Sequence, residues 1–162
     1  MEVINIYNKT CCFSGHRNMP EDALETIKKR LEAEIVDLLY QGVRYFYTGI
    51  APGFETLAAL TVLKLKNHFS YIQLILVLPG KDQSANWRAD DKKIDNQILA
   101  QADNVVYVAD NNYGSCRQEY TRYLVDNRRF CICYLTGAIG GTAHTVDYAK
   151  QRGLRIINIA SA

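Results

Sequence analysis

The chain has 162 residues, of which 48% are hydrophobic and 22% charged, and this composition fits one globular domain over residues 1–162. A net charge of +2 gives no argument for nucleic-acid binding, and no apolar run is long enough to cross a bilayer. Because the first residues lack a basic region followed by a long apolar run, we expect no signal peptide, no membrane association and a cytoplasmic location.

Short apolar runs alternate with apolar residues at helical spacing along the chain. After a lead-in or edge strand over 1–9, the predicted strands cover 10–14, 43–48, 71–78, 104–109, 130–135 and 154–159. The predicted helices cover 20–40, 53–67, 91–101, 116–126 and 142–152, with polar loops over 81–90 and 110–115. This alternation predicts an α/β fold of three layers, with helices on both faces of a mainly parallel sheet of about six strands.

Glycine-containing turns follow three of the predicted strands. Their candidate ligand-binding residues are Ser14, Gly15, His16 and Arg17; Thr48, Gly49 and Gly53; and Gly137, Gly140, Gly141 and Thr142. Right-handed crossovers place every strand-to-helix turn of a parallel sheet at one edge, so these turns should converge. Ligands of open α/β sheets bind at that edge. The sequence therefore predicts a ligand crevice built from three distant segments.

A phosphate group fits the chemistry of these turns. Small residues and free backbone N–H groups at a helix start attract anions, and both Gly53 and Gly141 precede or open predicted helices. Thr142 either caps its helix or donates to the phosphate, or does both. Arg17 either grips a phosphate bidentately or forms a surface ion pair with Glu21. His16 either donates to a phosphate or packs.

Two residues are candidates for acid–base chemistry, and one for base stacking. Glu55 lies in the first turn of its helix, where it either stabilises the helix dipole or binds ribose hydroxyls. Glu55 and His144 are the acid–base candidates if the chain is an enzyme. Trp87 either stacks on a base or, as we favour, packs on the domain flank or at an interface.

Other residue types indicate structure more than chemistry. The five cysteines include no CxxC pair, and four of them lie in predicted strands, so we expect buried, reduced thiols and no metal site. Arg128 and Arg129 precede the strand over 130–135 at the edge opposite the crevice, and we interpret them as a solvated turn. The helix over 116–126 carries Tyr120, Tyr123 and Leu124, more apolar surface than one sheet face needs, which suggests a homodimer.

These motifs together resemble the SLOG superfamily of Rossmann-like nucleotide-binding proteins, most closely its YpsA-like branch. The resemblance covers residues 10–159 and depends on Phe13-Ser14-Gly15-His16-Arg17, on residues 48–55 followed by Ala58-Ala59, on residues 83–87, and on Gly140-Gly141-Thr142. It implies a single Rossmann-like domain and a homodimer or larger assembly. It also implies that a nucleotide or nucleotide derivative binds as a ligand, without naming a specific cofactor. The superfamily also contains DprA-type DNA-processing proteins and LOG enzymes.

The chain departs from its relatives at several positions. LOG enzymes carry a Pro-Gly-Gly-x-Gly-Thr-x-x-Glu pattern, whereas this chain has Gly137 for the proline and Thr145 for the glutamate, which argues against phosphoribohydrolase activity. Where the YpsA-like branch has an Arg-Asn pair, this chain has Tyr120-Thr121, and Glu55 replaces a common aspartate.

Three functions compete on this evidence. The first is a sensor or binding module for a phosphate-containing, nucleotide-like ligand such as ADP-ribose, favoured because no clear catalytic constellation is present. The second is a hydrolase acting on a nucleotide N-glycosidic or phosphate bond. The third is a DprA-like, DNA-associated protein, against which the small net charge and the lack of a Lys/Arg stripe argue.

Overall fold

The structure, a computed structural model, describes residues 6–80, 87–108 and 117–160. The strands are β1 (Thr10–Gly15), β2 (Tyr45–Thr48), β3 (Gln73–Leu78), β4 (Asn104–Tyr107), β5 (Phe130–Tyr134) and β6 (Arg155–Asn158). The helices are α1 (Leu24–Tyr40), α2 (Phe54–Lys66), α3 (Ala89–Gln101), α4 (Arg117–Val125) and α5 (Gly141–Gln151). Every pair of neighbouring strands is parallel, so the predicted α/β fold with a parallel sheet is confirmed.

Most predicted boundaries agree with the structure to within one or two residues. The start of the first helix differs, because a 3-10 turn over Glu21–Ala23 precedes α1. The lead-in also differs, because Tyr7–Lys9 forms a 3-10 turn and not an edge strand. Residues 1–5, most of the loop over 81–90 and the whole loop over 110–115 lie outside the described residues.

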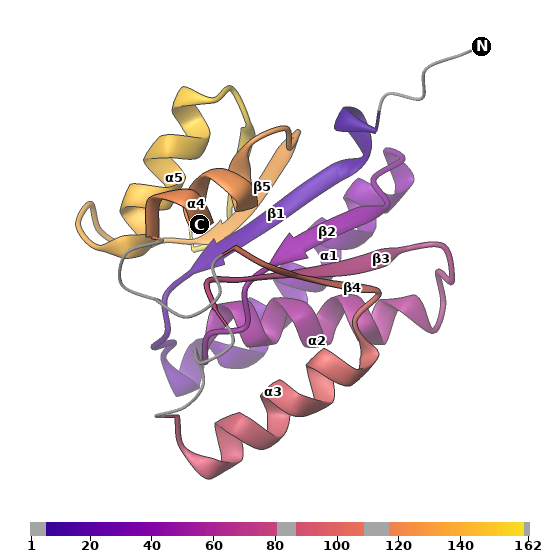
Figure 1. Cartoon of the computed structure of the whole chain (residues 1–162), viewed down its shortest axis with the longest axis vertical. Coiled ribbons are helices and arrows are strands. Elements are labelled where there is room, and N and C mark those ends of the chain that lie inside the picture. Colours follow the sequence, from indigo (N-terminus) through magenta and orange to yellow (C-terminus); the bar gives the residue numbers. More distant parts are fainter. Residues whose placement is uncertain (1–5, 81–86, 109–116, 161–162) are drawn as a thin grey trace.

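The strand order β4-β3-β2-β1-β5-β6 decides where the helices lie. The chain starts at β1 in the middle of the sheet, moves outward to β4, and then returns to place β5 on the other side of β1. Because right-handed crossovers in opposite directions put helices on opposite faces, α1, α2 and α3 cover one face and α4 and α5 the other (Figure 1). The order reverses at β1 and β5, where open α/β sheets hold ligands.

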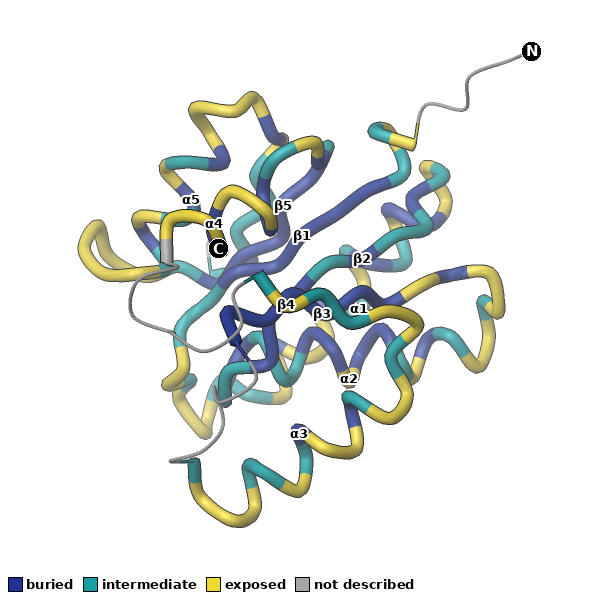
Figure 2. The backbone as a smooth tube through the Cα atoms, viewed as in Figure 1, coloured by how far each residue is buried: buried dark blue, intermediate teal, exposed yellow. Residues whose placement is uncertain are grey.

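The core lies on both sides of this sheet, and the central strands are buried almost throughout (Figure 2). Beneath α1 and α2, the rings of Phe13 and Phe46 stack with their centroids 6.0 Å apart. Beneath α4 and α5 lie the thiols of Cys12, Cys131 and Cys133. The cysteines of the described strands are free and buried, as predicted. Within the described ranges, every helix is too short or too polar for a bilayer span.

The predicted solvated turn at Arg128 is wrong. Only 8% of this residue is exposed, because its guanidinium lies 3.4 Å from the ring centroid of Tyr47 and donates a hydrogen bond to the Tyr123 carbonyl at 3.1 Å. Burial lowers the pKa of the Arg128 guanidinium. Stacking on an aromatic face thus draws this arginine under α4, where sequence position alone suggested solvent.

Candidate functional site

A cleft of about 530 Å³ opens at the carboxyl edge of the sheet, a size typical of small-molecule sites. It is lined by Ser14, Gly15, His16, Arg17, Ala51, Glu55, Pro79, Tyr120, Thr121, Gly140, Gly141, Thr142, His144 and Thr145. The structure thus brings residues from all three predicted turns into one cavity. Thr48, Gly49, Gly53, Gly137 and Trp87 are not among the lining residues.

Two glycines allow the first turn to pack directly on α2. A Cβ at Gly15 would overlap the ring of Phe54, so the missing side chain lets Phe54 close against the end of β1. Gly53 has a φ of +101°, and a Cβ there would overlap the carbonyl of Arg17. Both positions therefore require glycine for close approach, and Gly53 requires it for its backbone conformation as well.

The N-terminus of α2 is closed by the protein itself. The N–H of Phe54 donates to the carbonyl of His16 at 3.1 Å, and the N–H of Thr56 donates to the carbonyl of Ala51 at 3.3 Å. The carboxyl group of Glu55 accepts the N–H of Ala51 at 2.9 Å, so a side chain of the protein itself occupies this turn. The protein's own groups therefore take up several donors at the turn of Gly53, which makes the start of α5 the more open of the two helix starts.

The surroundings of Glu55 raise the pKa of its carboxyl group. Burial raises its pKa from 4.5 to about 7, although the hydrogen bond from Ala51 and the nearby charge of Arg17 act to lower it. A Cβ atom added at Gly49 would lie 2.8 Å from the Glu55 carboxyl group and would overlap the hydroxyl of Tyr120. Gly49 therefore makes room for two polar side chains that both line the cleft.

The raised pKa of Glu55 predicts a pH-dependent stability. Between about pH 4.5 and 7 the folded chain keeps a proton that the unfolded chain releases, so the free energy of unfolding should fall as the pH rises through this window. At about 1.4 kcal/mol per pKa unit, reduced for partial exposure, the loss should be on the order of 2 kcal/mol. Glu55→Gln, which keeps an acceptor for Ala51, should therefore gain stability relative to the parent at pH 8 but not at pH 4.5.

Chemical denaturation at the two pH values measures this difference. Glu25→Gln is the matched control, because Glu25 also lies in the first turn of a helix but is exposed. An equal Glu55→Gln effect at both pH values would contradict the assignment of a buried, protonated carboxyl group.

The start of α5 is open. Its N-cap is Gly140, with a φ of +118° and no side-chain hydrogen bond, so Thr142 lies inside the helix and does not cap it. Among the described residues, the N–H groups of Gly141 and Thr142 donate no hydrogen bond. Both residues line the cleft. Unpaired amides at the positive end of a helix dipole form a ready anion site.

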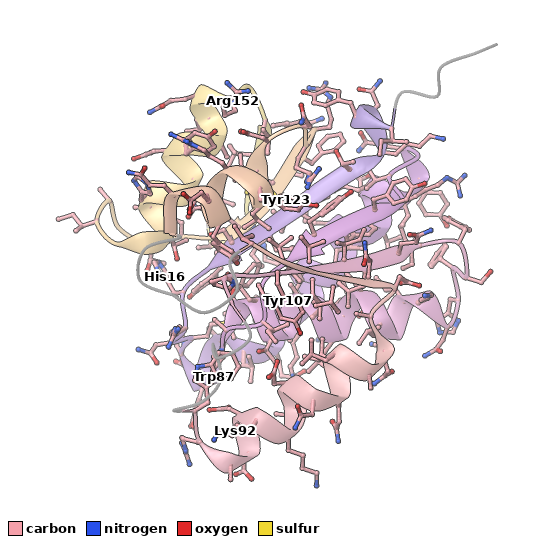
Figure 3. All side chains as sticks on the ribbon, viewed as in Figure 1. His16, Trp87, Lys92, Tyr107, Tyr123 and Arg152 are labelled. Atoms are coloured by element: carbon pink, nitrogen blue, oxygen red, sulfur yellow. The ribbon has the colours of Figure 1, made fainter. Side chains whose placement is uncertain are left out.

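His16 joins the first turn to the third. Its Nε2 lies 2.9 Å from the nitrogen and 3.1 Å from the carbonyl oxygen of Thr136, so it accepts from the N–H when the ring proton is on Nδ1 and donates to the carbonyl when the proton is on Nε2. The ring packs edge-on against Tyr134. The N–H of His16 also donates to the carbonyl of Tyr134 at 3.3 Å. Figure 3 shows His16 at the carboxyl end of β1, beside the β5–α5 connection. Of the two roles predicted for His16, the packing role accounts for the hydrogen bond that Nε2 makes with Thr136.

Arg17 is exposed at the cleft, and among the described residues it forms no ion pair with Glu21 or any other carboxylate.

Trp87 lies at the start of α3, away from His16, and packs partly buried against the core beneath α1 and α2 (Figure 3). The favoured packing role of Trp87 therefore fits the structure, whereas base stacking in the cleft does not.

Sequence analysis missed Tyr120 and Thr121 as cleft residues, although their departure from the Arg-Asn pair of the YpsA-like branch was a signal. They lie on α4, whose place over the end of β1 depends on the strand order. The structure also weakens the argument for a homodimer, because Tyr120 lines the cleft and Leu124 is buried. Of the three residues on which this argument depended, Tyr123 is the exposed one, at 45%.

A parallel sheet with a ligand-sized cleft at its strand-order reversal defines a Rossmann-like α/β protein. A family profile described as the YspA SLOG family (YpsA) matches residues 12–153, and the chain belongs to this family. The resemblance that the strand-end motifs suggested is thereby confirmed.

Several relatives support the assignment. UPF0398 protein BH1768 of Halalkalibacterium halodurans is 30% identical over 129 residues, which cover 78% of this chain and 68% of that protein. The uncharacterized SPbeta prophage-derived protein YoqJ of Bacillus subtilis is 26% identical over 146 residues, covering 82% and 85%. A solved structure of DNA processing protein A from Helicobacter pylori, described for its single-stranded DNA binding mode, superposes with a TM-score of 0.62 at 14% identity. That match covers 91% of this chain but only 63% of the other, and it shows a common fold.

Proposed function

We propose that the cleft binds a phosphate-bearing nucleotide or nucleotide derivative such as ADP-ribose, and that the protein is a binding or sensor module. The observation that carries this proposal is the open N-terminus of α5 in the same cavity as Arg17. Free amides and a guanidinium without a carboxylate partner are the groups that proteins use to hold phosphate.

The remaining lining residues suit the rest of such a ligand. The cleft is roomy enough for a nucleotide, and Tyr120 and Thr121 offer it an aromatic ring and hydroxyl groups. Glu55 sits deeper, where a carboxyl group with a pKa near 7 both donates and accepts hydrogen bonds and suits a sugar hydroxyl. Among the described residues, Arg17 is the single arginine that lines the cleft, and no described lysine lines it. This charge suits one or two phosphates and not the backbone of a long nucleic acid.

A hydrolase is the second candidate, favoured by one observation. The pKa of Glu55 lies near neutral pH, as general acid–base catalysis requires. Against it, the position of the LOG glutamate holds Thr145, whose hydroxyl donates to the Gly141 carbonyl at 3.1 Å inside α5. We therefore place binding first. The homodimer and the cytoplasmic location stay predictions.

Thermal unfolding in the presence of ADP-ribose, NAD, AMP and inorganic phosphate tests the proposal. A probe at about one hundred times its dissociation constant should stabilise the chain by about 2.7 kcal/mol. Arg17→Ala should weaken binding of that probe by about 1.5–3 kcal/mol, the scale of a hydrogen bond to a charged group. Arg88→Ala, at an exposed arginine outside the cleft, is the control.

Chromatography of the same mixtures separates the two functions. Intact probe after long incubation supports a binding module, whereas products that disappear with Glu55→Gln support a hydrolase. If none of the probes shifts the unfolding temperature, the cleft does not bind this class of ligand.

A further inference from the structure

The amino edge of the sheet, opposite the cleft, carries a row of basic residues. Lys9, Arg44 and Arg129 directly precede β1, β2 and β5, and Arg155 begins β6. These are four neighbouring strands of the sheet. At about 4.8 Å between strands, the row is about 14 Å long. We call these four residues the basic row.

Backbone hydrogen bonds hold the row together. The N–H of Arg44 donates to the carbonyl of Lys9 at 2.9 Å, and the N–H of Arg155 donates to the carbonyl of Arg129 at 3.0 Å. Between these pairs, the N–H of Arg129 donates to the hydroxyl of Thr10 at 3.0 Å. These bonds hold the backbones of residues that are far apart in the sequence side by side, which is why no Lys/Arg stripe is visible along the chain. Arg155 is exposed, and Lys9, Arg44 and Arg129 are half-buried.

The charge of the row is not neutralised within the described part of the chain. The ion pairs there involve Lys28, Lys64, Lys66 and Arg152, and no member of the row. Nearby acids are already engaged: Asp103 pairs with Lys66, and Asp126 accepts from Tyr148 and pairs with Arg152. A net charge of +2 thus conceals a segregated positive edge.

Aromatic rings accompany the cations. The guanidinium of Arg44 lies 4.4 Å from the ring centroid of Tyr71, which is 45% exposed. The guanidinium of Arg129 lies 5.5 Å from the ring centroid of Phe130, which is buried and not open to a base. Tyr40, at the end of α1, is 81% exposed. Cations interleaved with aromatic rings are the common feature of surfaces that bind single strands, because phosphates meet the charges and bases stack on the rings.

Helix dipoles do not explain this arrangement. Basic residues in the last turn of a helix stabilise its negative end, which accounts for Lys64, Lys66 and Lys150. The arginines of the row, in contrast, precede or begin strands.

We propose that the basic row binds single-stranded nucleic acid through its phosphates, with the exposed tyrosines at this edge available for base stacking. This site is separate from the cleft and does not depend on the function proposed for it.

Fluorescence anisotropy of labelled dT15 and rU15 with the full chain, at about 50 to 200 mM salt, tests the proposal. A plot of the logarithm of the affinity against the logarithm of the salt concentration should have a slope of about −0.7 per phosphate contact, so about −2.8 for four cations. Over this fourfold range of salt, that slope means a loss of roughly 50-fold in affinity. The triple variant R44Q/R129Q/R155Q should lose on the order of 100-fold in affinity and most of the salt dependence. Binding to either oligonucleotide supports the proposal, and the tighter complex identifies the preferred sugar.

Matched variants separate this site from general charge effects. R88Q/K92Q/K93Q removes the same number of cations, but from the start of α3 and not from the row, and it should keep parental affinity. Arg17→Ala should also keep it, since Arg17 lies in the cleft. If the triple variant of the row unfolds, the single variant Arg155→Gln replaces it, because Arg155 is exposed. This variant should show the smaller loss of oligonucleotide affinity that is expected when one phosphate contact is removed.

Four results would overturn the proposal. They are no salt-dependent binding, an equal loss in both triple variants, a loss confined to Arg17→Ala, or equally tight binding of polyglutamate, which would indicate an acidic protein partner.

Discussion

Valine at position 141 should abolish binding of any nucleotide probe that stabilises the parent chain, while leaving the fold intact. Gly141 is the first residue of α5 and lines the cleft. A Cβ there meets no atom within 4 Å, and Gly141 is not among the glycines with a positive φ, so the backbone accepts valine. The added methyl groups would instead fill the space from which a phosphate reaches the free N–H groups.

Isothermal titration and thermal unfolding of the variant measure both parts of this expectation. Ala138→Val is the control, because Ala138 is an exposed residue of the same β5–α5 loop but does not line the cleft. It should bind the probe like the parent. If Gly141→Val also binds like the parent, the phosphate does not lie at the start of α5, and the proposed site is wrong.

Alanine at position 53 should destabilise the fold by about 3 kcal/mol or more, the largest loss that we expect from a single methyl group. A left-handed backbone costs a non-glycine residue about 1–2 kcal/mol. Gly53, with a φ of +101°, carries a second cost, because its Cβ would overlap the Arg17 carbonyl. Overpacking of this kind adds about 1–3 kcal/mol, since a backbone group cannot move aside as a flexible side chain can.

Gly137→Ala separates the two costs. Gly137 also has a positive φ, of +88°, but a Cβ there meets nothing within 4 Å. Urea denaturation should therefore show a loss of only about 1–2 kcal/mol for Gly137→Ala. Equal losses for the two variants would mean that the turn before α1 yields easily, and that Gly53 does not hold Arg17 in place.

The two glycine substitutions together describe how the cleft is built. Gly141 leaves the start of α5 open for a ligand, whereas Gly53 lets the turn after β1 close the start of α2. Phe54 completes this closure, because its N–H binds the carbonyl of His16 and its ring lies against Gly15. Similar glycine-rich turns in the sequence therefore have opposite roles in the structure.

The local pattern of the sequence was enough to predict the elements and the edge at which the cleft lies. The apolar run of β3 and the helical spacing of Leu31, Ile35 and Leu38 in α1 depend on neighbouring residues alone. Strand alternation then limits the fold to a parallel sheet, and the fixed hand of its crossovers places the glycine turns at one edge. Gly15, Arg17 and Gly141 were predicted to meet for this reason, and they line one cleft.

Contacts between distant strands decided the rest. The return of the chain to place β5 beside β1 brings His16 to Thr136 and α4 over the cleft, yet no local pattern records strand order. The same return buries Arg128 against Tyr47 and aligns Arg44, Arg129 and Arg155 along the opposite edge. Such pairings join residues up to 120 positions apart, and their energies arise only when the sheet has formed. Local propensity and spacing therefore predict where strands end, whereas tertiary structure alone determines which side chains meet there.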